Sequence, residues 1–260
     1  MDFGLRGKGA VVTGASRGLG AAIAEALAAE GMDLLLVARD RASLDANAAA
    51  LQAQHKIRAI VHEADLTSIA AIDPVAQAAN ALPSVDVLVN CAGATKRGDF
   101  FKLTDADWES GFSLKFFGAV RLSRALWPKL KDAKGTIINI VGVGARMPGA
   151  DFTIGGSVNA AFLHFTKALA EVGTRDGVRV NAINPGYFHT DRLAHSLRSA
   201  AEQAGVPVEQ AAEVLLSKIG VRRFGRAEEV AHLVAFMASG QAGYLNGSAI
   251  EIDGGTRRNI

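Results

Sequence analysis

Short runs of apolar, largely β-branched residues alternate with longer segments of helical pattern along nearly the whole chain. The runs are apolar at successive positions, which is typical of strands buried on both faces. Helical segments between consecutive strands favour a parallel sheet that is covered on both faces by right-handed connections. Strands are expected at Ala10–Thr13, Leu34–Val37, Ala59–Val61, Val85–Val89, Thr136–Val141, Arg179–Ile183 and Ala249–Ile252.

The alternation runs without a linker, repeat or low-complexity tract, so residues 1–260 are interpreted as one doubly wound α/β domain with a parallel seven-stranded sheet. One segment, about 186–225, departs from this rhythm with two successive helical patterns, Asp191–Gln203 and Val208–Ile219. It follows a strand, and in such folds ligands bind beyond the carboxyl ends of the strands. We therefore expect a lid-like insertion over a binding crevice, called the lid segment below.

Composition narrows the classes of function. The 28 Lys plus Arg residues against 26 Asp plus Glu give a net charge of +2, too balanced for a dedicated nucleic-acid-binding protein. A single cysteine, Cys91, excludes an internal disulfide framework and favours a reducing compartment. No apolar run reaches the about 18 residues of a membrane span, and the first residues lack a secretory signal pattern. The cytoplasm is the expected location.

The first predicted strand leads into the glycine-rich loop Gly14-Ala15-Ser16-Arg17-Gly18-Leu19-Gly20, which an alanine-rich helix follows. Glycines let the backbone turn sharply and approach a pyrophosphate, whose charge the helix N-terminus stabilises. A glycine cluster is also compatible with a tight turn that binds nothing. Its position between the first strand and the first helix favours nucleotide binding.

Several motifs in order along the chain resemble those of the short-chain dehydrogenase/reductase family. They are Thr13-Gly14-x-x-x-Gly18-x-Gly20, Asp65 for the adenine, Asn90-Cys91-Ala92-Gly93, Asn184-Pro185-Gly186 with Thr190 on the nicotinamide side, and the ending Asp253-Gly254-Gly255. The resemblance implies a Rossmann fold that binds a dinucleotide. The cofactor-binding residues that it implies are Gly14, Ser16, Arg17, Gly18, Leu19, Gly20, Arg39, Asp65, Leu66, Asn90, Ala92, Gly93, Pro185, Gly186 and Thr190.

The end of the second predicted strand bears on the choice of cofactor. A carboxylate there accepts from the ribose 2′-hydroxyl of NAD, whereas an arginine accommodates the 2′-phosphate of NADP. Arg39 follows that strand, and with Arg17 it is predicted to hold the 2′-phosphate, so NADP(H) is favoured over NAD(H). Each arginine alone is also compatible with a solvated surface charge. Asp40 leaves NAD(H) open, because a small loop shift could bring it to the ribose.

The resemblance implies four catalytic residues. In that family a tyrosine transfers the hydroxyl proton, a serine hydrogen-bonds the carbonyl oxygen, a lysine lowers the tyrosine pKa and holds the nicotinamide ribose, and an asparagine anchors a water. By flanking residues, the positions of the asparagine, serine, tyrosine and lysine fall on Lys115, Gly142, Gly155 and Asn159. No tyrosine lies between residues 114 and 186.

Lysine and asparagine thus exchange places at 115 and 159. Our hypothesis is that the exchange keeps a cation beside the nicotinamide ribose while Gly142 and Gly155 enlarge the pocket. Drift after loss of activity is the alternative. The candidate catalytic residues are Lys115, Asn159 and Tyr187. Tyr187, which directly follows Pro185-Gly186, is the first candidate for the substitute proton donor, and Lys115 could donate if desolvation lowers its pKa. A tyrosine in the lid segment is also compatible with simple packing against substrate.

The function implied is NADP(H)-dependent oxidoreduction of a carbonyl or secondary alcohol, with a small-molecule substrate and no nucleic-acid or membrane partner. Two alternatives stay open, namely non-redox lyase-type chemistry and a catalytically silent nucleotide-binding subunit. The histidines show no metal-ligand pairing, so no metal site is expected. The predicted helix Ser157–Val172 is apolar around most of its circumference, which favours a homotetramer or homodimer.

Overall fold

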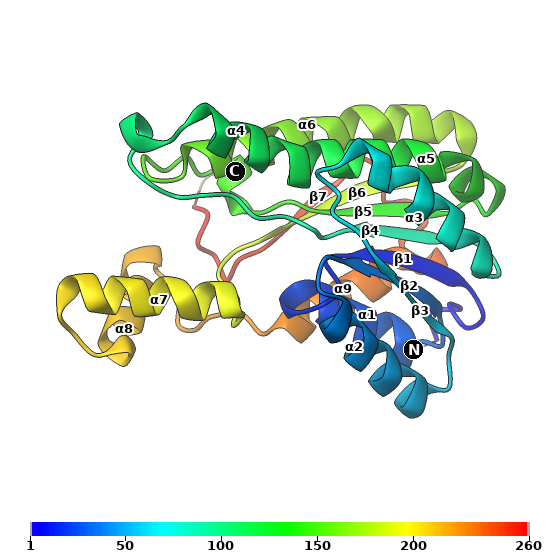
Figure 1. Ribbon diagram of the computed structural model, residues 1–260, viewed down its shortest axis with the longest axis horizontal. Helices are drawn as coiled ribbons and strands as arrows, with labels where there is room; N and C mark the ends of the chain where they lie inside the picture. Colours follow the sequence, from blue (N-terminus) through cyan, green and yellow to red (C-terminus); the bar gives the residue numbers. More distant parts are fainter. Residues whose placement is uncertain (1, 259–260) are drawn as a thin grey trace.

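The computed structural model describes residues 2–258 (Figure 1). Within this range seven strands form one parallel sheet in the order β3-β2-β1-β4-β5-β6-β7, which confirms the predicted fold class. Each predicted strand is present, and its ends differ from the expectation by at most two residues. The strands are β1 Gly9–Thr13, β2 Asp33–Ala38, β3 Ala59–Glu63, β4 Val87–Asn90, β5 Thr136–Ile140, β6 Arg179–Pro185 and β7 Ala249–Ile252.

The position of the binding crevice follows from the strand order. β1 pairs with β2 on one side and with β4 on the other, so the direction of the crossovers reverses between β1 and β4. The loops after these two strands leave the sheet toward opposite faces, and the space between them opens at the carboxyl edge. The glycine-rich loop and residues 90–93 therefore flank this switch point.

Helices cover both faces of the sheet, as Figure 1 shows, with α1, α2 and α9 below it and α3, α5 and α6 above it. Apolar side chains from the strands fill both interfaces, because every strand in the middle of the sheet is buried on its two faces. The helices are α1 Gly18–Ala29, α2 Arg41–His55, α3 Ile72–Ala78, α4 Asp105–Phe112, α5 Gly118–Asp132, α6 Thr153–Asp176, α7 Asp191–Ala204, α8 Val208–Ile219 and α9 Ala227–Ala238.

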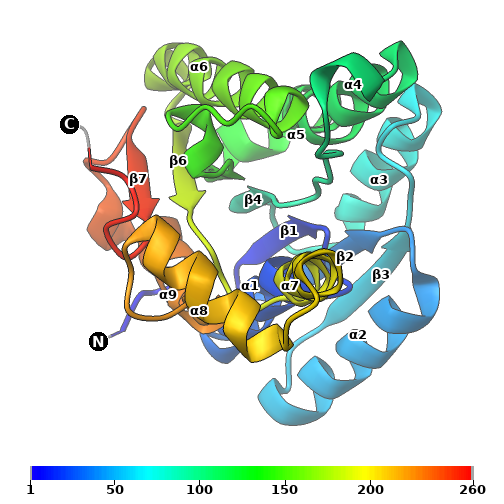
Figure 2. The same ribbon diagram turned by 90° about the vertical axis from the view of Figure 1, so that its left-hand side faces the viewer.

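The lid segment contains α7 and α8, which stand beyond the carboxyl ends of the strands (Figures 1 and 2). These helices pack on each other through an apolar cluster of their own, centred on Leu193, Leu197 and Phe224. A bridge between Phe188 and Gly225 ties the two ends of the segment together. The segment thus has an apolar cluster of its own and its two ends are joined to each other.

Helix α6 is longer than predicted, because it begins at Thr153 and continues to Asp176 rather than spanning Ser157–Val172. It ends at Gly177, whose φ of +77° is the left-handed conformation that terminates many helices. None of the helices within residues 2–258 combines the length and the apolarity that a membrane crossing demands.

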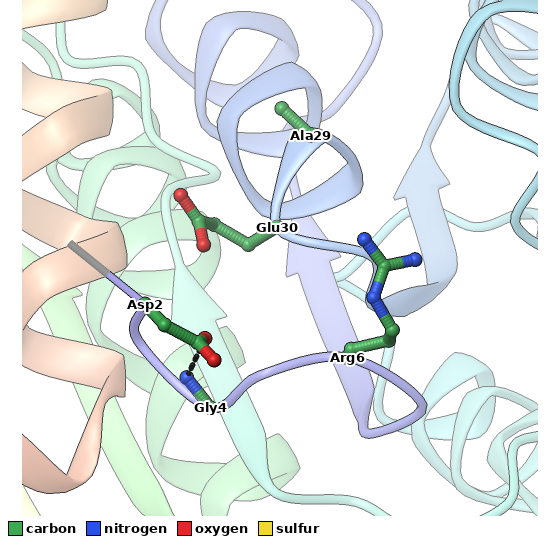
Figure 3. A pocket seen from close by; sticks show the side chains of 5 residues that line it. All are labelled: Asp2, Gly4, Arg6, Ala29 and Glu30. Atoms are coloured by element: carbon green, nitrogen blue, oxygen red, sulfur yellow. Dashed lines mark hydrogen bonds between the residues drawn. The ribbon is translucent and has the colours of Figure 1, made fainter.

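A surface hollow lies at the other edge of the sheet. Asp2, Gly4, Arg6, Ala29 and Glu30 line it (Figure 3). Ala29 ends α1, which runs back from the carboxyl edge, so this hollow lies near the start of β1. It is therefore separate from the crevice at the switch point.

Two glycines of α6 provide a test of this packing. A Cβ at Gly173 would lie 2.0 Å from the carbonyl oxygen of Val178, whereas a Cβ at Gly156 would meet only the Gly144 carbonyl oxygen, at 3.5 Å. We expect Gly173→Ala to lower the free energy of unfolding by about 1–3 kcal/mol through overpacking. Gly156→Ala is expected to leave stability unchanged or raise it by up to about 1 kcal/mol. Urea unfolding measures both, and equal effects would contradict the packing described.

Candidate active site

The glycine-rich loop has the conformation that close approach to a ligand requires. Gly14 and Gly18 have φ values of +69° and +58°, and a Cβ at Gly20 would lie 2.1 Å from the Gly14 carbonyl oxygen. Residues other than glycine rarely adopt this backbone, and none would fit at Gly20. Arg17 is the N-cap of α1 and makes no side-chain cap hydrogen bond to the described backbone. The first amides of α1 are thus placed to bind an anion, which fits a pyrophosphate.

Asn47 of α2 holds the glycine-rich loop in place by hydrogen bonds to its backbone. Its Nδ2 donates to the carbonyl oxygens of Ala15 and Ser16, at 2.9 and 3.0 Å. Sequence reasoning missed Asn47. In the sequence, Asn47 is marked only as a polar residue within the alanine-rich run of α2. Its hydrogen bonds reach residues more than thirty positions away, which the sequence pattern does not reveal.

Thr13 joins the glycine-rich loop to the end of β4. Its hydroxyl accepts from the amides of Cys91 and Ala92, at 2.9 and 3.0 Å, and donates to the Val89 carbonyl oxygen. The two segments approach so closely that a Cβ at Gly14 would lie 3.0 Å from the Cα of Ala92. The predicted residues at the ends of β1 and β4 therefore lie together on the two sides of the switch point.

Buried amides extend this connection across the sheet. The Asn90 Nδ2 donates to the Asn139 Oδ1 of β5 at 2.9 Å, and the Asn139 Nδ2 donates to the Thr166 Oγ1 of α6 at 2.9 Å. All three side chains are buried. Asn90 was predicted to bind cofactor, and here it is a structural link between β4, β5 and α6.

The end of β2 carries Arg39, which is exposed, as is Arg17 of the glycine-rich loop. Asp40 is the N-cap of α2, and its carboxylate accepts from the Ser43 hydroxyl at 2.7 Å and the Ser43 amide at 3.1 Å. These hydrogen bonds, with the nearby charge of Arg17, hold the pKa of Asp40 below its usual range. Asp40 therefore has a structural partner already, while both arginines project into solvent.

The adenine-side candidates lie directly after β3. Asp65 is exposed, and its Oδ1 accepts from the Thr67 amide at 3.0 Å. Leu66 is buried against the start of α5, where a Cβ at Gly118 would lie 3.1 Å from the Leu66 carbonyl oxygen. The short turn leaves the Asp65 carboxylate at the surface of the crevice.

On the nicotinamide side, the start of the lid segment meets the glycine-rich loop. A Cβ at Gly18 would lie 3.6 Å from the methyl group of Thr190, which caps α7 by accepting from the Leu193 amide. Pro185 ends β6, and Gly186 lies so close to Asp253 that a Cβ there would be 2.9 Å from the Asp253 Cα. The structure thus brings Thr190 and Gly18, 172 residues apart, to one place.

Lys115 lies in a π-helical segment, Ser113–Phe117, between α4 and α5. π-helical turns are rare and are often found at functional sites. The Lys115 ammonium donates to the Val141 carbonyl oxygen and, at 2.7 Å, to the Asn159 Oδ1. Its stem passes over Gly93, where a Cβ would lie 2.9 Å from the lysine Cδ. The structure therefore brings Lys115 and Asn159 into direct contact, and the hypothesis that this cation lies beside the nicotinamide ribose stays a prediction.

The surroundings of Lys115 change its acidity. Removal of the ammonium from water lowers its pKa from 10.5 to about 7, and the charge of Arg192 acts in the same direction. Both oxygens that accept hydrogen bonds from the ammonium are neutral, and within residues 2–258 no carboxylate pairs with Lys115 to restore the ordinary pKa. Lys115 can exchange a proton near neutral pH.

Gly142 and Gly155, which the family resemblance aligns with a serine and a tyrosine, differ in their surroundings. Gly142 has a φ of +130°, and a Cβ there would lie 3.2 Å from the Asn159 Nδ2. At Gly155 a Cβ would lie 2.1 Å from the ring of Phe152, so the expectation that Gly155 enlarges the pocket is wrong. The Phe152 ring fills that volume, and the Arg97 guanidinium covers the ring at 4.0 Å from its centre.

Tyr187 lies apart from this pair. Its ring packs against the apolar cluster of the lid segment, with Leu193, Leu197 and Phe224. Within residues 2–258 no hydrogen bond joins Tyr187 to Lys115 or Asn159. A catalytic role for Tyr187 stays a prediction. In the same range, no group of three His, Cys, Asp or Glu side chains is placed to share a metal ion.

Comparisons with known proteins agree with this geometry. Residues 8–201 match a family model described as short chain dehydrogenase. The acetoacetyl-CoA reductase of Shinella zoogloeoides is 35% identical over 251 residues, which cover 95% of this chain and 97% of that protein. The 3-oxoacyl-(acyl-carrier-protein) reductase of Escherichia coli (strain K12) is 33% identical, with 98% of each chain covered.

Among solved structures, the L-sorbose reductase from Gluconobacter frateurii, complexed with NADPH and L-sorbose, superposes with a TM-score of 0.96. Its sequence is 32% identical, and the match covers 100% of both chains. The agreement therefore includes the lid segment as well as the sheet. The chain belongs to the short-chain dehydrogenase family.

Proposed function

We propose that the protein is an NADP(H)-dependent oxidoreductase that interconverts a carbonyl group and a secondary alcohol, with Lys115 as its proton-transfer group. One observation carries this proposal. The Lys115 ammonium is held by the Val141 carbonyl oxygen and by Asn159, at the carboxyl edge of the sheet, with a pKa of about 7. The reductases among the relatives favour carbonyl reduction over non-redox chemistry.

The cofactor would bind at the carboxyl edge of the sheet, between the glycine-rich loop and the loop after β4. The first amides of α1 and the glycine-rich loop would bind the pyrophosphate, and Arg17 and Arg39 would bind the 2′-phosphate. When bound, NADPH supplies a hydride equivalent. The solved structure of L-sorbose reductase is a complex with NADPH, which supports this choice over NAD(H).

Lys115 would act at its Nζ atom. In reduction the ammonium donates a proton to the carbonyl oxygen and becomes a neutral amine, and in oxidation the neutral amine accepts the hydroxyl proton. A general acid is most effective when its pKa lies near the working pH. Asn159 holds the amine in place and, as an uncharged partner, leaves the pKa low. A lysine in water-poor surroundings is rare unless it has a partner or a role, which favours a retained function over drift after loss of activity.

The pKa of Lys115 sets the expected pH dependence. Reduction needs the ammonium, so kcat/KM should be flat below pH about 7 and fall roughly tenfold per pH unit above it, whereas oxidation should rise through the same range. Lys115→Ala should lower kcat/KM by about 10²–10⁴-fold. Steady-state rates of NADPH oxidation over a panel of carbonyl compounds provide the measurement.

Lys115→Arg and Tyr187→Phe are the matched variants. Arginine keeps a cation that does not titrate near neutrality, so the break near pH 7 should disappear. Tyr187→Phe should retain both the rate and the break. If Tyr187→Phe instead removes turnover while Lys115→Ala retains it, Tyr187 is the acid. NADPH binding without turnover of any compound would indicate a silent nucleotide-binding subunit.

The 2′-phosphate assignment predicts a selective loss of affinity. Arg17→Ala with Arg39→Ala should raise the Kd for NADPH by about 10–100-fold, because charge-assisted hydrogen bonds to the phosphate are lost. The Kd for NADH should stay within about twofold, since NADH lacks that phosphate. Calorimetry measures both constants. A wild-type protein that binds NADH as tightly as NADPH would contradict the assignment.

We also propose that the chain forms a homotetramer or homodimer through α6 and the π-helical segment Ser113–Phe117 that leads into α5. Phe117 and Val172 are both 42% exposed, and Phe116 of the π-helical segment forms an edge-to-face pair with Phe165 of α6. Light scattering should give a mass of two or four chains. Phe117→Glu with Val172→Glu should lower that mass, because a buried unpaired charge opposes association, while Glu171→Gln on the same helix should not. A monomeric wild-type protein would contradict this proposal.

A further inference from the structure

Arg192 connects the lid segment to the loop that follows β4. It lies in the first turn of α7, and its Nη2 is 3.4 Å from both the carbonyl oxygen and the Oγ1 of Thr95. Thr95 in turn lies beside Gly111, and a Cβ at Gly111 would be within 3.8 Å of Val158, the neighbour of Asn159 on α6. Arg192 therefore reaches the same side of the crevice as the Lys115–Asn159 pair.

Two carboxylates near this loop already have cationic partners. Asp151 pairs with Arg97 at 2.8 Å, and Asp107 pairs with Lys96 at 2.9 Å. Within the described residues neither Arg192 nor Lys115 has a carboxylate at ion-pair distance, and Arg192 is exposed. Lys115, from the segment before α5, and Arg192, from α7, thus lie on the same side of the crevice without a carboxylate partner among the described residues.

The electrostatics indicate that these groups are close enough to repel. The charge of Arg192 lowers the pKa of Lys115, and the charge of Arg97 lowers that of Arg192, in each case after desolvation. Lys115 lies in water-poor surroundings, where a nearby like charge is unfavourable unless an anion joins the two cations, and the exposed guanidinium of Arg192 is accessible to such an anion. The arginine fork suits a carboxylate or phosphate, because it can donate two parallel hydrogen bonds.

We propose that Arg192 is a specificity-determining residue that binds an anionic group of the substrate, so that the substrate is a carbonyl compound carrying a carboxylate or phosphate. This inference rests on the proposed function for the carbonyl, while the binding of the anion can be measured without turnover. Arg192 is the residue of the lid segment that reaches the β4 loop, so binding of the anion would also hold the lid segment against the crevice.

The cofactor phosphates are the competing anions. Thr190, rather than Arg192, lies against Gly18 of the pyrophosphate loop, and Arg17 and Arg39 are at the other end of the crevice, after β1 and β2. Arg192 contacts Thr95, which follows β4. The affinity for NADPH is therefore measured separately, because it distinguishes an Arg192 that binds a cofactor phosphate from one that binds an anionic group of the substrate.

The test uses matched pairs of compounds that differ in charge. Acetoacetate is compared with methyl acetoacetate, and dihydroxyacetone phosphate with dihydroxyacetone, each titrated into the NADP⁺ complex of the full chain, in which the carbonyl group cannot be reduced. We expect the anion of at least one pair to bind at least about tenfold more tightly than its neutral partner. The pair that shows this preference identifies the carboxylate or the phosphate as the preferred group.

Arg192→Ala should abolish that preference and leave the Kd for NADPH within about twofold, and Arg192→Lys should restore it in part. Arg198→Ala, an exposed arginine of the same helix, should change neither value. Equal binding within both pairs, including no binding of either member, would overturn the proposal. So would a loss of NADPH affinity in Arg192→Ala that accounts for the whole effect. A charge preference without turnover of any compound would instead contradict the proposed function alone.

Discussion

Backbone amides and carbonyl oxygens just beyond the ends of parallel strands have no hydrogen-bond partner in the sheet. The site is built from the side chains that form these hydrogen bonds instead. Thr13 accepts from the amides that follow β4, and Asn184 accepts from the Gly142 amide that follows β5. Lys115 donates to the Val141 carbonyl oxygen in the same way. A buried polar group without a partner is unfavourable, so these contacts hold the carboxyl edge in one arrangement. The Lys115 ammonium is held at the crevice because the Val141 carbonyl oxygen needs a hydrogen-bond donor there.

Gly142 and Gly155, the two glycines that the family resemblance aligns with a serine and a tyrosine, are not equivalent. The backbone at Gly142, with its φ of +130°, has departed from the conformation that a serine adopts readily. At Gly155 the Phe152 ring fills the volume of a side chain, and Arg97 with Asp151 covers it. Restoring the two side chains alone would therefore clash with the ring and strain the backbone. The site is therefore defined by the side chains that pack near Lys115 and Asn159, such as Phe152 and Arg97, and does not contain two empty spaces.

The fold could be predicted from the sequence because its signals are local. Apolar runs specify the buried strands, and the glycines at positions 14, 18 and 20 mark a loop that only glycine can form. The meeting of Lys115 with Asn159 was accessible through the family resemblance. Asn47, Phe152 and Arg192 were not predicted, because each acts through contacts with residues that spacing does not reveal. The contact between Arg192 and Thr95 spans 97 positions, and the Phe152 ring takes its place only through the turn before α6.

The central claim is that the Lys115 amine takes the role of the proton donor because its surroundings lower its pKa. A direct titration of the Lys115 Nζ by ¹⁵N NMR, in protein with labelled lysine and with Lys115→Arg used to assign the signal, tests this claim without any substrate. An apparent pKa of about 7 is the predicted result. A value near the ordinary 10.5 would show that the ammonium stays charged at neutral pH, and would contradict the account.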